Sequence, residues 1–350
     1  MSDFSVVENS LTESSATWLH QPYVSVKQMS PKGLRLLLSL ASEMKTLVKE
    51  NGGDSRLQHR ILATIFYEPS TRTMGSFQSA MLRLGGSVIN VDTATSSVKK
   101  GETLGDTIRC LSCYADAIVI RHPTTGAALE AASHRGGKVL VNAGDGVGEH
   151  PSQALLDVFT IEDELKARGG LQGKCLVLLG DLANGRTVHS LVKLIARSGI
   201  AGVSFKYCSP ASLRMPPEVM SEVSKYGLPQ EECTDLASAL SGADVLYVTR
   251  VQKERFASLE QYERLKLAFV VTPATLAQCK ASCVLMHPLP RVGEIEEACD
   301  ADPRAAYFRQ MEAGLYLRMA LLALLFGVTR ERLELEARRQ DADAGDAGAL

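Results

Sequence analysis

The segment ILATIFYEPSTRTMGSFQSAMLRL, residues 61–84, contains the unit from which the fold is built. It begins with an apolar run, Ile61–Tyr67, whose length and β-branched residues are typical of a buried strand. It continues over Ser70–Leu84 as a helical pattern, and Pro69 and Ser70 suit the start of that helix. The segment therefore predicts a strand followed directly by a helix.

The same alternation of strand and helix recurs along most of the chain. Further strands are predicted at Ser87–Val91, Ala117–Ile120, Lys138–Val141, Lys174–Leu179, Val203–Tyr207, Val245–Val248 and Val284–Met286. Further helices are predicted at Lys32–Lys49, Thr103–Tyr114, Gln153–Arg168, Thr187–Arg197 and Arg304–Phe326. Because this order is typical of parallel sheets covered by helices, we predict an α/β fold with two domains, each a parallel β-sheet flanked by helices.

Two domains are expected because 350 residues are more than a single core usually serves. The glycines at 169, 170 and 173 indicate where one sheet ends and the next begins. The last apolar helix is expected to return to the first domain. We therefore predict a first domain of residues 1–151 plus 305–350 and a second of residues 152–304, with a disordered tail over 341–350.

The composition excludes several classes of partner. The formal net charge of -2 gives no reason to expect nucleic acid or an anionic membrane, although arginines collected in a pocket could still bind an anionic substrate. Residues 1–30 lack the features of a signal or transit peptide. The apolar stretch Met319–Val328 is shorter than the ~20 residues that span a bilayer. We expect a soluble, cytoplasmic protein.

The cysteines do not follow the spacing of a metal site. Cys110 and Cys113 form a C-x-x-C, but they fall in a predicted helix, and Cys279 and Cys283 form a looser pair beside a predicted strand. A structural zinc site needs four ligands with tight spacing at both ends. We therefore predict reduced, buried thiols and no metal.

Polar clusters follow the predicted strands, at the sheet edge where ligands of parallel α/β proteins bind. Ser70–Thr73 combines hydroxyls, an arginine and a helix start, which together could hold a phosphate. Taken alone, the cluster is slightly better explained as an ordinary helix cap. Arg121–Pro123 and His150–Gln153 are expected at the same edge, and three such clusters favour a ligand site.

The second half of the chain carries three more such segments. Gly180–Arg186 follows a strand but lacks the G-x-G-x-x-G spacing of a dinucleotide site. Thr249–Glu254 alone is typical of a salt-bridged surface loop. His287–Arg291 contains two prolines, which predict a rigid bend with exposed carbonyl groups.

Taken in order, these clusters resemble the catalytic chains of the aspartate carbamoyltransferase family. The resemblance runs from about Ser30 to Val328 and rests on the ordered set: Ser70-Thr71-Arg72-Thr73, Arg121-His122-Pro123, His150-Pro151-Ser152-Gln153, Gly185-Arg186-Thr187, Arg250-Val251-Gln252-Lys253-Glu254 and His287-Pro288-Leu289-Pro290-Arg291. It implies an enzyme that carbamoylates L-aspartate from carbamoyl phosphate in pyrimidine biosynthesis, without a cofactor.

The resemblance also implies a role for each site residue. The phosphate of carbamoyl phosphate would be held by Ser70, Thr71, Arg72 and Thr73, and its carbonyl oxygen would be contacted by Thr73, Arg121 and His150. The carbamoyl amide and the amine would be oriented by Gln153 and the carbonyl groups of Pro288 and Leu289, and the aspartate carboxylates would be held by Arg186, Arg250 and Gln252. Ser96 and Lys100 would reach across from a neighbouring subunit of a homotrimer.

The mechanism that these roles imply needs no protein nucleophile, because phosphate is already a good leaving group. The main catalytic contribution would come from Arg72, Thr73, Arg121, His150 and Lys100 as preorganised donors. His150 is interpreted as a donor to the oxyanion and not as a general base.

The sequence departs from the family pattern at Met74, where a basic residue is frequent, and at Ala183-Asn184, where Lys-Tyr or Lys-His is frequent. These changes bear on aspartate binding and domain closure. Two alternatives are an ornithine-type or other amino-acid carbamoyltransferase and a catalytically silent homologue acting as a binding subunit. The first usually has His-Cys-Leu-Pro where this chain has His287-Pro288-Leu289-Pro290, and the second should have lost phosphate or oxyanion residues.

Overall fold

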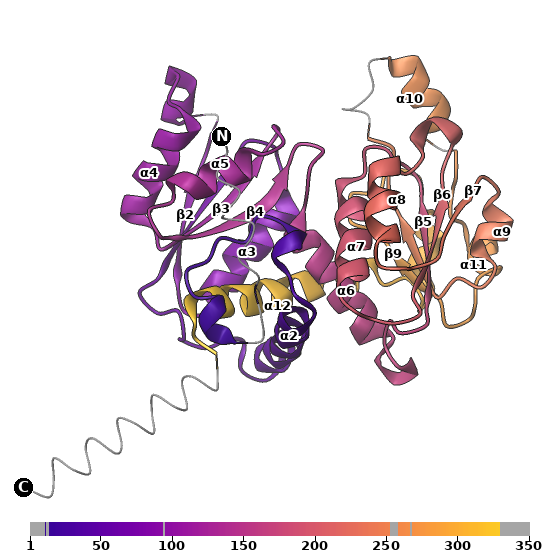
Figure 1. The fold of residues 1–350 in the computed structure, drawn as a ribbon, viewed down its shortest axis with the longest axis horizontal. Coiled ribbons are helices and arrows are strands. Elements are labelled where there is room, and N and C mark those ends of the chain that lie inside the picture. The colour runs from indigo at the N-terminus through magenta and orange to yellow at the C-terminus, as the bar shows by residue number, and fades with distance from the viewer. Residues whose placement is uncertain (1–10, 12–13, 94, 253–257, 267, 330–350) are drawn as a thin grey trace, which may run out of the picture.

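The computed structural model describes residues 11, 14–93, 95–252, 258–266 and 268–329. These residues form two groups of elements that lie side by side (Figure 1). Each group contains one parallel sheet with helices packed on it, which confirms the fold class predicted from the alternation of strands and helices.

The first sheet has the order β2-β1-β3-β4, with β1 (Ile61–Phe66) at its interior. β2 (Ser87–Val91) is an edge strand, and β3 (Ala117–His122) and β4 (Val139–Asp145) complete the sheet. Every residue of β4 is buried, including Asn142 and Asp145, which explains why the strand runs further than the apolar pattern predicts. The main covering helices are α2 (Pro31–Asn51), α3 (Thr71–Arg83), α4 (Leu104–Tyr114) and α5 (Ala127–His134).

The second sheet has the order β7-β6-β5-β8-β9. Its strands are β5 (Cys175–Leu179), β6 (Ser204–Cys208), β7 (Gln230–Cys233), β8 (Val245–Val248) and β9 (Val284–Met286). Its helices are α7 (Arg186–Arg197), α8 (Pro217–Ser224), α9 (Leu236–Leu240), α10 (Leu259–Leu265) and α11 (Pro273–Leu276). β7 was not predicted, because this edge strand has the polar sequence QEEC and no buried residue.

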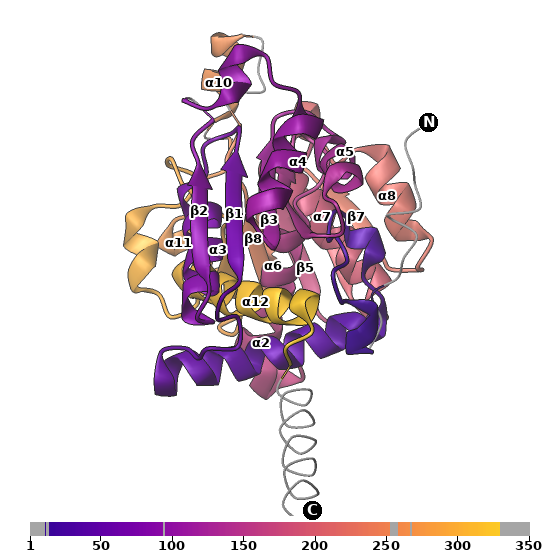
Figure 2. The same ribbon diagram turned by 90° about the vertical axis from the view of Figure 1, so that its left-hand side faces the viewer.

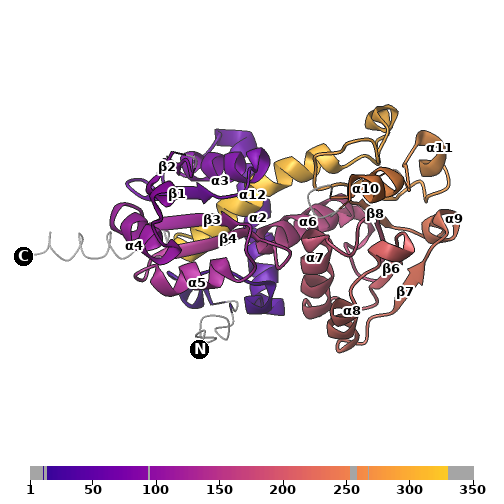
Figure 3. The same ribbon diagram turned by 90° about the horizontal axis from the view of Figure 1, so that it is seen from above.

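Two helices connect the groups. α6 (Pro151–Glu164) follows β4 and packs against β4, α7 and α12, and Figure 3 shows it between the two sheets. α12 (Tyr307–Phe326) follows the second sheet and packs against α2 and α3, crossing under the strands of the first sheet in Figure 2. The chain thus returns to its first sheet, while the domain boundaries at 151/152 and 304/305 stay a prediction.

The prediction that the cysteines are buried holds for only part of them. Cys208, Cys279, Cys283 and Cys299 are buried, but Cys110 and Cys113 are exposed. The helix α4 turns Ile108 and Leu111 toward the core, so positions 110 and 113 fall on its outer face. Within the described ranges no group of three or more His, Cys, Asp or Glu side chains is placed to hold a metal ion.

No helix in the described part of the chain is both long enough and apolar enough to cross a membrane.

Candidate active site

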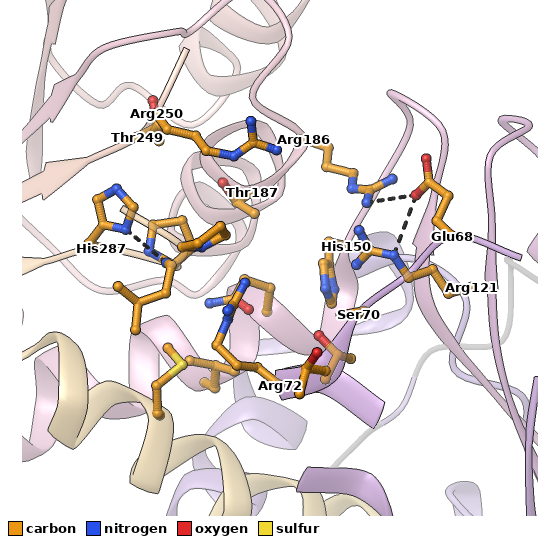
Figure 4. Close-up of a pocket in the computed structure, with 18 of the residues that line it drawn as sticks. Glu68, Ser70, Arg72, Arg121, His150, Arg186, Thr187, Thr249, Arg250 and His287 are labelled. Atoms are coloured by element: carbon orange, nitrogen blue, oxygen red, sulfur yellow. Dashed lines mark hydrogen bonds and ion pairs between the residues drawn. The ribbon is translucent and has the colours of Figure 1, made fainter. Parts of the chain in front are cut away.

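A cavity of about 750 Å³ lies where the carboxyl ends of strands from the two sheets meet. Its lining comes from the end of β3, from the segments after β1, β8 and β9, from the starts of α3, α6 and α7, and from α12 (Figure 4). Twelve of the residues assigned to the site from the sequence line it: Ser70, Thr71, Arg72, Thr73, Arg121, His150, Gln153, Arg186, Arg250, Gln252, Pro288 and Leu289. Their roles toward substrate stay predictions.

Three helices begin at this cavity without a side-chain cap. The residues at their N-caps are Ser70 for α3, His150 for α6 and Gly185 for α7, and none of the three caps its helix through a side chain. The Ser70 hydroxyl therefore does not form the hydrogen bond of an ordinary helix cap, which was the alternative explanation for the cluster Ser70–Thr73. Three helix N-termini directed at one space favour a negatively charged ligand there.

The charge of the lining residues also favours a negatively charged ligand. Five described lining residues are arginines, at positions 72, 121, 186, 250 and 318, whereas Glu68 is the one acidic residue among them. The Arg186 Nη2 and the Arg121 Nε lie 3.1 and 3.4 Å from Glu68 Oε2, as the dashed lines in Figure 4 show. One carboxylate offsets only part of this positive charge, so the cavity is suited to more than one anionic group.

Burial and mutual repulsion act on the arginines themselves. The pKa of Arg121 is lowered to about 10, first by burial and then by neighbouring Arg186, although Glu68 acts in the opposite direction. Burial and Arg250 lower the pKa of Arg72. Since Arg250 follows β8 in the second sheet and Arg72 follows β1 in the first, the two halves of the site share one electrostatic environment.

His150 is 3 % exposed, and its backbone N–H donates to Ser190 Oγ at 3.1 Å. Its pKa lies well below the ordinary value, because of burial and then the positive charges of Arg121, Arg186 and Arg318. Its ring is therefore neutral near pH 7. The buried Nδ1 makes no hydrogen bond among the described residues, so the ring retains hydrogen-bonding capacity for a ligand.

On the second-sheet side, Asp181 holds two loops together. Its carboxylate accepts hydrogen bonds from Asn184 N and Nδ2, at 3.0 and 3.1 Å, and from Gln252 N at 3.3 Å. The Gln252 side chain also donates through Nε2 to Asn184 O at 2.8 Å. Asn184, one of the departures from the family pattern, is thus part of the scaffold of Gln252. Lys253 and Glu254 of the same loop lie outside the described residues.

The segment after β9 forms a rigid bend, as the two prolines predict. Leu289 has a φ of 52° and precedes a cis bond to Pro290. Its N–H donates to His287 Nδ1 at 2.8 Å, and His287 Nε2 lies 2.6 Å from Glu294 Oε1. The buried His287 ring therefore fixes the backbone of Pro288 and Leu289 at the cavity wall.

Ser96 and Lys100 do not line this cavity. They stand at the two ends of a short 3-10 helix, with Ser96 as its N-cap and Lys100, an exposed residue, at its end. Met74 lies in the first turns of α3, and its N–H donates to Ser70 O at 3.1 Å.

Glu68 and Arg318 line the cavity although no role was predicted for them, as do Thr187 and Thr249, which stand in the predicted polar segments. Glu68 was visible beside the Ser70 cluster, but its ion pairs join segments far apart in the chain. Arg318 is 3 % exposed and its guanidinium lies 4.9 Å from the centre of the Phe77 ring. An arginine within the most apolar part of α12 was a usable signal, since arginine is almost never fully buried unless it is paired.

Comparison with known proteins agrees with this geometry. The family model for the aspartate/ornithine carbamoyltransferase carbamoyl-P binding domain matches residues 21–163, and the model for the Asp/Orn binding domain matches residues 172–325. The aspartate carbamoyltransferase catalytic subunit of Thermococcus kodakarensis is 46% identical over 312 residues, covering 89% of this chain and 98% of that protein.

A longer relative and a solved structure extend the comparison. Multifunctional protein pyr1-3 of Dictyostelium discoideum is 54% identical over 303 residues, and the matched part is 87% of this chain but 13% of that protein's length. A crystal structure of Trypanosoma cruzi aspartate transcarbamoylase in complex with carbamoyl phosphate and aspartate has a TM-score of 0.82 at 41% identity, covering 88% of this chain and 97% of the other.

The matched models cover both halves of the chain, and the Thermococcus kodakarensis and Trypanosoma cruzi proteins match it over nearly their whole length, whereas the chain spans about an eighth of the multifunctional Dictyostelium discoideum protein. The resemblance inferred from the ordered polar clusters is confirmed: this chain belongs to the aspartate/ornithine carbamoyltransferase family.

Proposed function

We propose that this chain is an aspartate carbamoyltransferase, which joins the carbamoyl group of carbamoyl phosphate to the amine of L-aspartate and releases phosphate. The product, N-carbamoyl-L-aspartate, is an intermediate of pyrimidine biosynthesis. The observation that carries the proposal is the single cavity at which three uncapped helix N-termini meet five arginines. The relatives named for this activity, and the related structure with both substrates, support the choice of substrates.

On the first-sheet side, Ser70, Thr71, Arg72 and Thr73 hold the phosphate at the N-terminus of α3. Arg121, His150 and Thr73 contact the carbonyl oxygen of the carbamoyl group. A neutral, buried His150 suits this role because it can donate one hydrogen bond to an oxygen on which negative charge develops. It is a poor general base for the same reason, since its pKa is far below the ordinary value.

The reaction then proceeds without a covalent intermediate on the protein. The neutral amine of aspartate attacks the carbamoyl carbon, the new C–N bond forms, and the C–O bond to phosphate breaks. The departing phosphate takes the amine proton. Holding both substrates in one cavity supplies much of the rate enhancement, because the reacting atoms meet without a second diffusional encounter.

The charge of the second-sheet side favours aspartate over ornithine as acceptor. Arg186, Arg250 and Gln252 bind the two carboxylates of aspartate, whereas the side-chain ammonium of ornithine would be placed among arginines. A steady-state assay of the purified chain with carbamoyl phosphate and either amino acid tests the proposal. We expect carbamoylaspartate and no carbamoylornithine. Absence of both products would support a catalytically silent homologue.

The proposal includes a cytoplasmic homotrimer in which Ser96 and Lys100 complete the site of a neighbouring chain. Their position outside this chain's own cavity is consistent with that role. Lys100→Ala and Arg250→Ala should each be nearly inactive when aspartate is kept at a concentration well below the raised KM of Arg250→Ala. After dissociation and reassembly in equal amounts, random mixing should restore about a quarter of the sites. Activity that stays at the level of the separate variants, despite proven subunit exchange, would exclude a shared site.

A further inference from the structure

Asp157 is a completely buried carboxylate on α6 that accepts three hydrogen bonds. Gln153 Nε2 and Gln310 Nε2 donate to its Oδ1, at 2.9 and 2.7 Å, and Tyr247 Oη donates to its Oδ2 at 2.8 Å. Asp157 itself does not line the cavity, whereas Gln153 does. The three donors come from α6, α12 and β8, so one side chain joins α6 and α12 to a strand of the second sheet.

Each donor residue either lines the cavity itself or is joined by the chain or by a hydrogen bond to a segment that lines it. Tyr247 precedes Thr249 and Arg250 by two and three residues on the same strand end. Gln310 uses the other end of its amide as well, because its Oε1 accepts from the backbone N–H of His287 at 3.0 Å. His287 is followed by Pro288 and Leu289, which line the cavity. Displacement of the Asp157 carboxylate would therefore affect three walls of the site at once.

The most direct consequence concerns the amide of Gln153. A carboxylate oxygen that already receives an N–H group from Gln310 can only accept, so Gln153 must turn its NH₂ group toward Asp157. Its carbonyl oxygen Oε1 is then the end of the amide left for the cavity. An acceptor there fits an N–H group of the substrate, either the carbamoyl amide or the attacking amine, and does not fit a carbonyl or phosphate oxygen.

We propose that Asp157 is a positioning residue, which holds Gln153 with its oxygen toward the substrate nitrogen and fixes the wall segments at Arg250 and Leu289. The inference rests on the proposed function, since it assigns the substrate group that Gln153 recognises. The essential property of Asp157 is an acceptor at Oδ1. A protonated or an ionised carboxyl group keeps that acceptor, as does the amide of asparagine.

This distinction defines the informative substitutions. In Asp157→Asn the Oδ1 acceptor remains for Gln153 and Gln310, while Nδ2 can donate to Tyr247 once the phenol hydroxyl turns. Asp157→Ala leaves all three donors without their acceptor. Tyr247→Phe removes only the bond to Oδ2. We expect kcat to fall on the order of 10- to 100-fold in Asp157→Ala, by roughly threefold or less in Asp157→Asn, and by an intermediate factor in Tyr247→Phe.

Gln28→Ala is the matched control for loss of buried hydrogen bonds. Gln28 is also completely buried, and its side chain bonds to Val24 N, Ser25 N and Pro22 O, but it lies outside the cavity lining. It should lose thermal stability and keep kcat. Equal loss of kcat in Gln28→Ala and Asp157→Ala, at similar Tm, would reduce Asp157 to a general structural role and overturn the proposal.

A double-mutant cycle tests whether Asp157 acts through Gln153. If it does, adding Asp157→Ala to Gln153→Ala should lower kcat much less than Asp157→Ala lowers it in the wild-type chain. Full additivity of the two effects contradicts the proposal, as does an Asp157→Asn variant that is folded but as slow as Asp157→Ala. If Asp157→Ala does not fold, Asp157→Ser, which is too short to reach Gln153, is measured against the same criteria.

The wild-type chain is assayed first, so that the two proposals fail separately. A wild-type chain that forms no carbamoylaspartate contradicts the proposed function. With an active wild type, the variants test only the role of Asp157.

Discussion

The two sides of the cavity are built differently. On the first-sheet side, Ser70–Thr73 stand at the N-terminus of α3, after β1, and His150 and Gln153 stand at the start of α6, after β4. On the second-sheet side, Gln252 is held by a loop-to-loop network through Asp181 and Asn184. The first arrangement is fixed by short segments of sequence, whereas the second depends on contacts between distant loops. We therefore expect changes on the two sides to separate in their effects on the two substrates.

The largest effect is expected at Arg121, on the first-sheet side. Arg121→Ala removes a buried cavity-lining donor that we propose contacts the developing oxyanion, and loss of one such donor lowers kcat by about 10²–10³-fold in comparable sites. The measurement is kcat at saturating concentrations of both substrates. Arg135→Ala is the control, because Arg135 is also partly buried, bonds to Ala132 O at 2.8 Å and lies outside the cavity. A rise in the KM values with an unchanged kcat would contradict an oxyanion role.

The next effect is expected at Arg250, on the second-sheet side. Arg250→Ala should raise the KM for aspartate by roughly 10–150-fold, since removing a charged hydrogen-bonding group costs ~1.5–3 kcal/mol. The KM for carbamoyl phosphate should change little. An unchanged dependence on aspartate would show that Arg250 does not bind the acceptor, and an equal rise in both KM values would remove the contrast between the two sides.

A smaller effect is expected at Asn184, which acts only through Gln252. Asn184→Ala deletes the Nδ2 bond to Asp181 but keeps the backbone bonds of residue 184. Losing a hydrogen bond of about 1 kcal/mol should raise the KM for aspartate by roughly fivefold. The KM for carbamoyl phosphate serves as the internal control. If the KM for carbamoyl phosphate changes instead, the Asp181 network supports the binding of carbamoyl phosphate and not the binding of aspartate.

The smallest effect is expected in the pH dependence of stability. Burial raises the pKa of Asp157 to about 7 from its ordinary value of 3.8, so the folded chain retains a proton that the unfolded chain loses. Asp157 therefore lowers stability progressively as the pH rises from about 4 to 7, and its contribution is constant above that range. Asp157→Asn has no such titration.

The Tm of Asp157→Asn relative to wild type should increase between pH 5 and pH 8 by a few degrees, on the order expected for a change of 1 or 2 kcal/mol. Thermal unfolding of both proteins in the same buffers measures the difference. A Tm difference that does not vary with pH would mean that Asp157 does not titrate in this interval.

The same contrast separates what could be predicted from what could not. Apolar strands, helix starts and the polar residues after each strand are local patterns, and they predicted two parallel sheets and the clusters at Ser70 and His150. The exposed Cys110 and Cys113 were mispredicted because a helix face is decided by what packs on it. The polar strand β7 was missed because pairing with β6, and not its own residues, makes it a strand.

The sequence by itself determined most of the order of strands and helices and many of the side chains around the cavity, because these follow from periodicity and from residue types at strand ends. The ordered set of polar clusters also carried the resemblance to the family. Only the tertiary structure decided that Glu68 pairs with Arg121 and Arg186, that Arg318 reaches the cavity from α12, and that Asp157 joins Gln153, Tyr247 and Gln310. Except for the bond between Gln153 and Asp157, which lie four residues apart on α6, each of these contacts links segments separated by many residues. Their geometry is set by how the two sheets and α12 pack, and no local pattern carries that information.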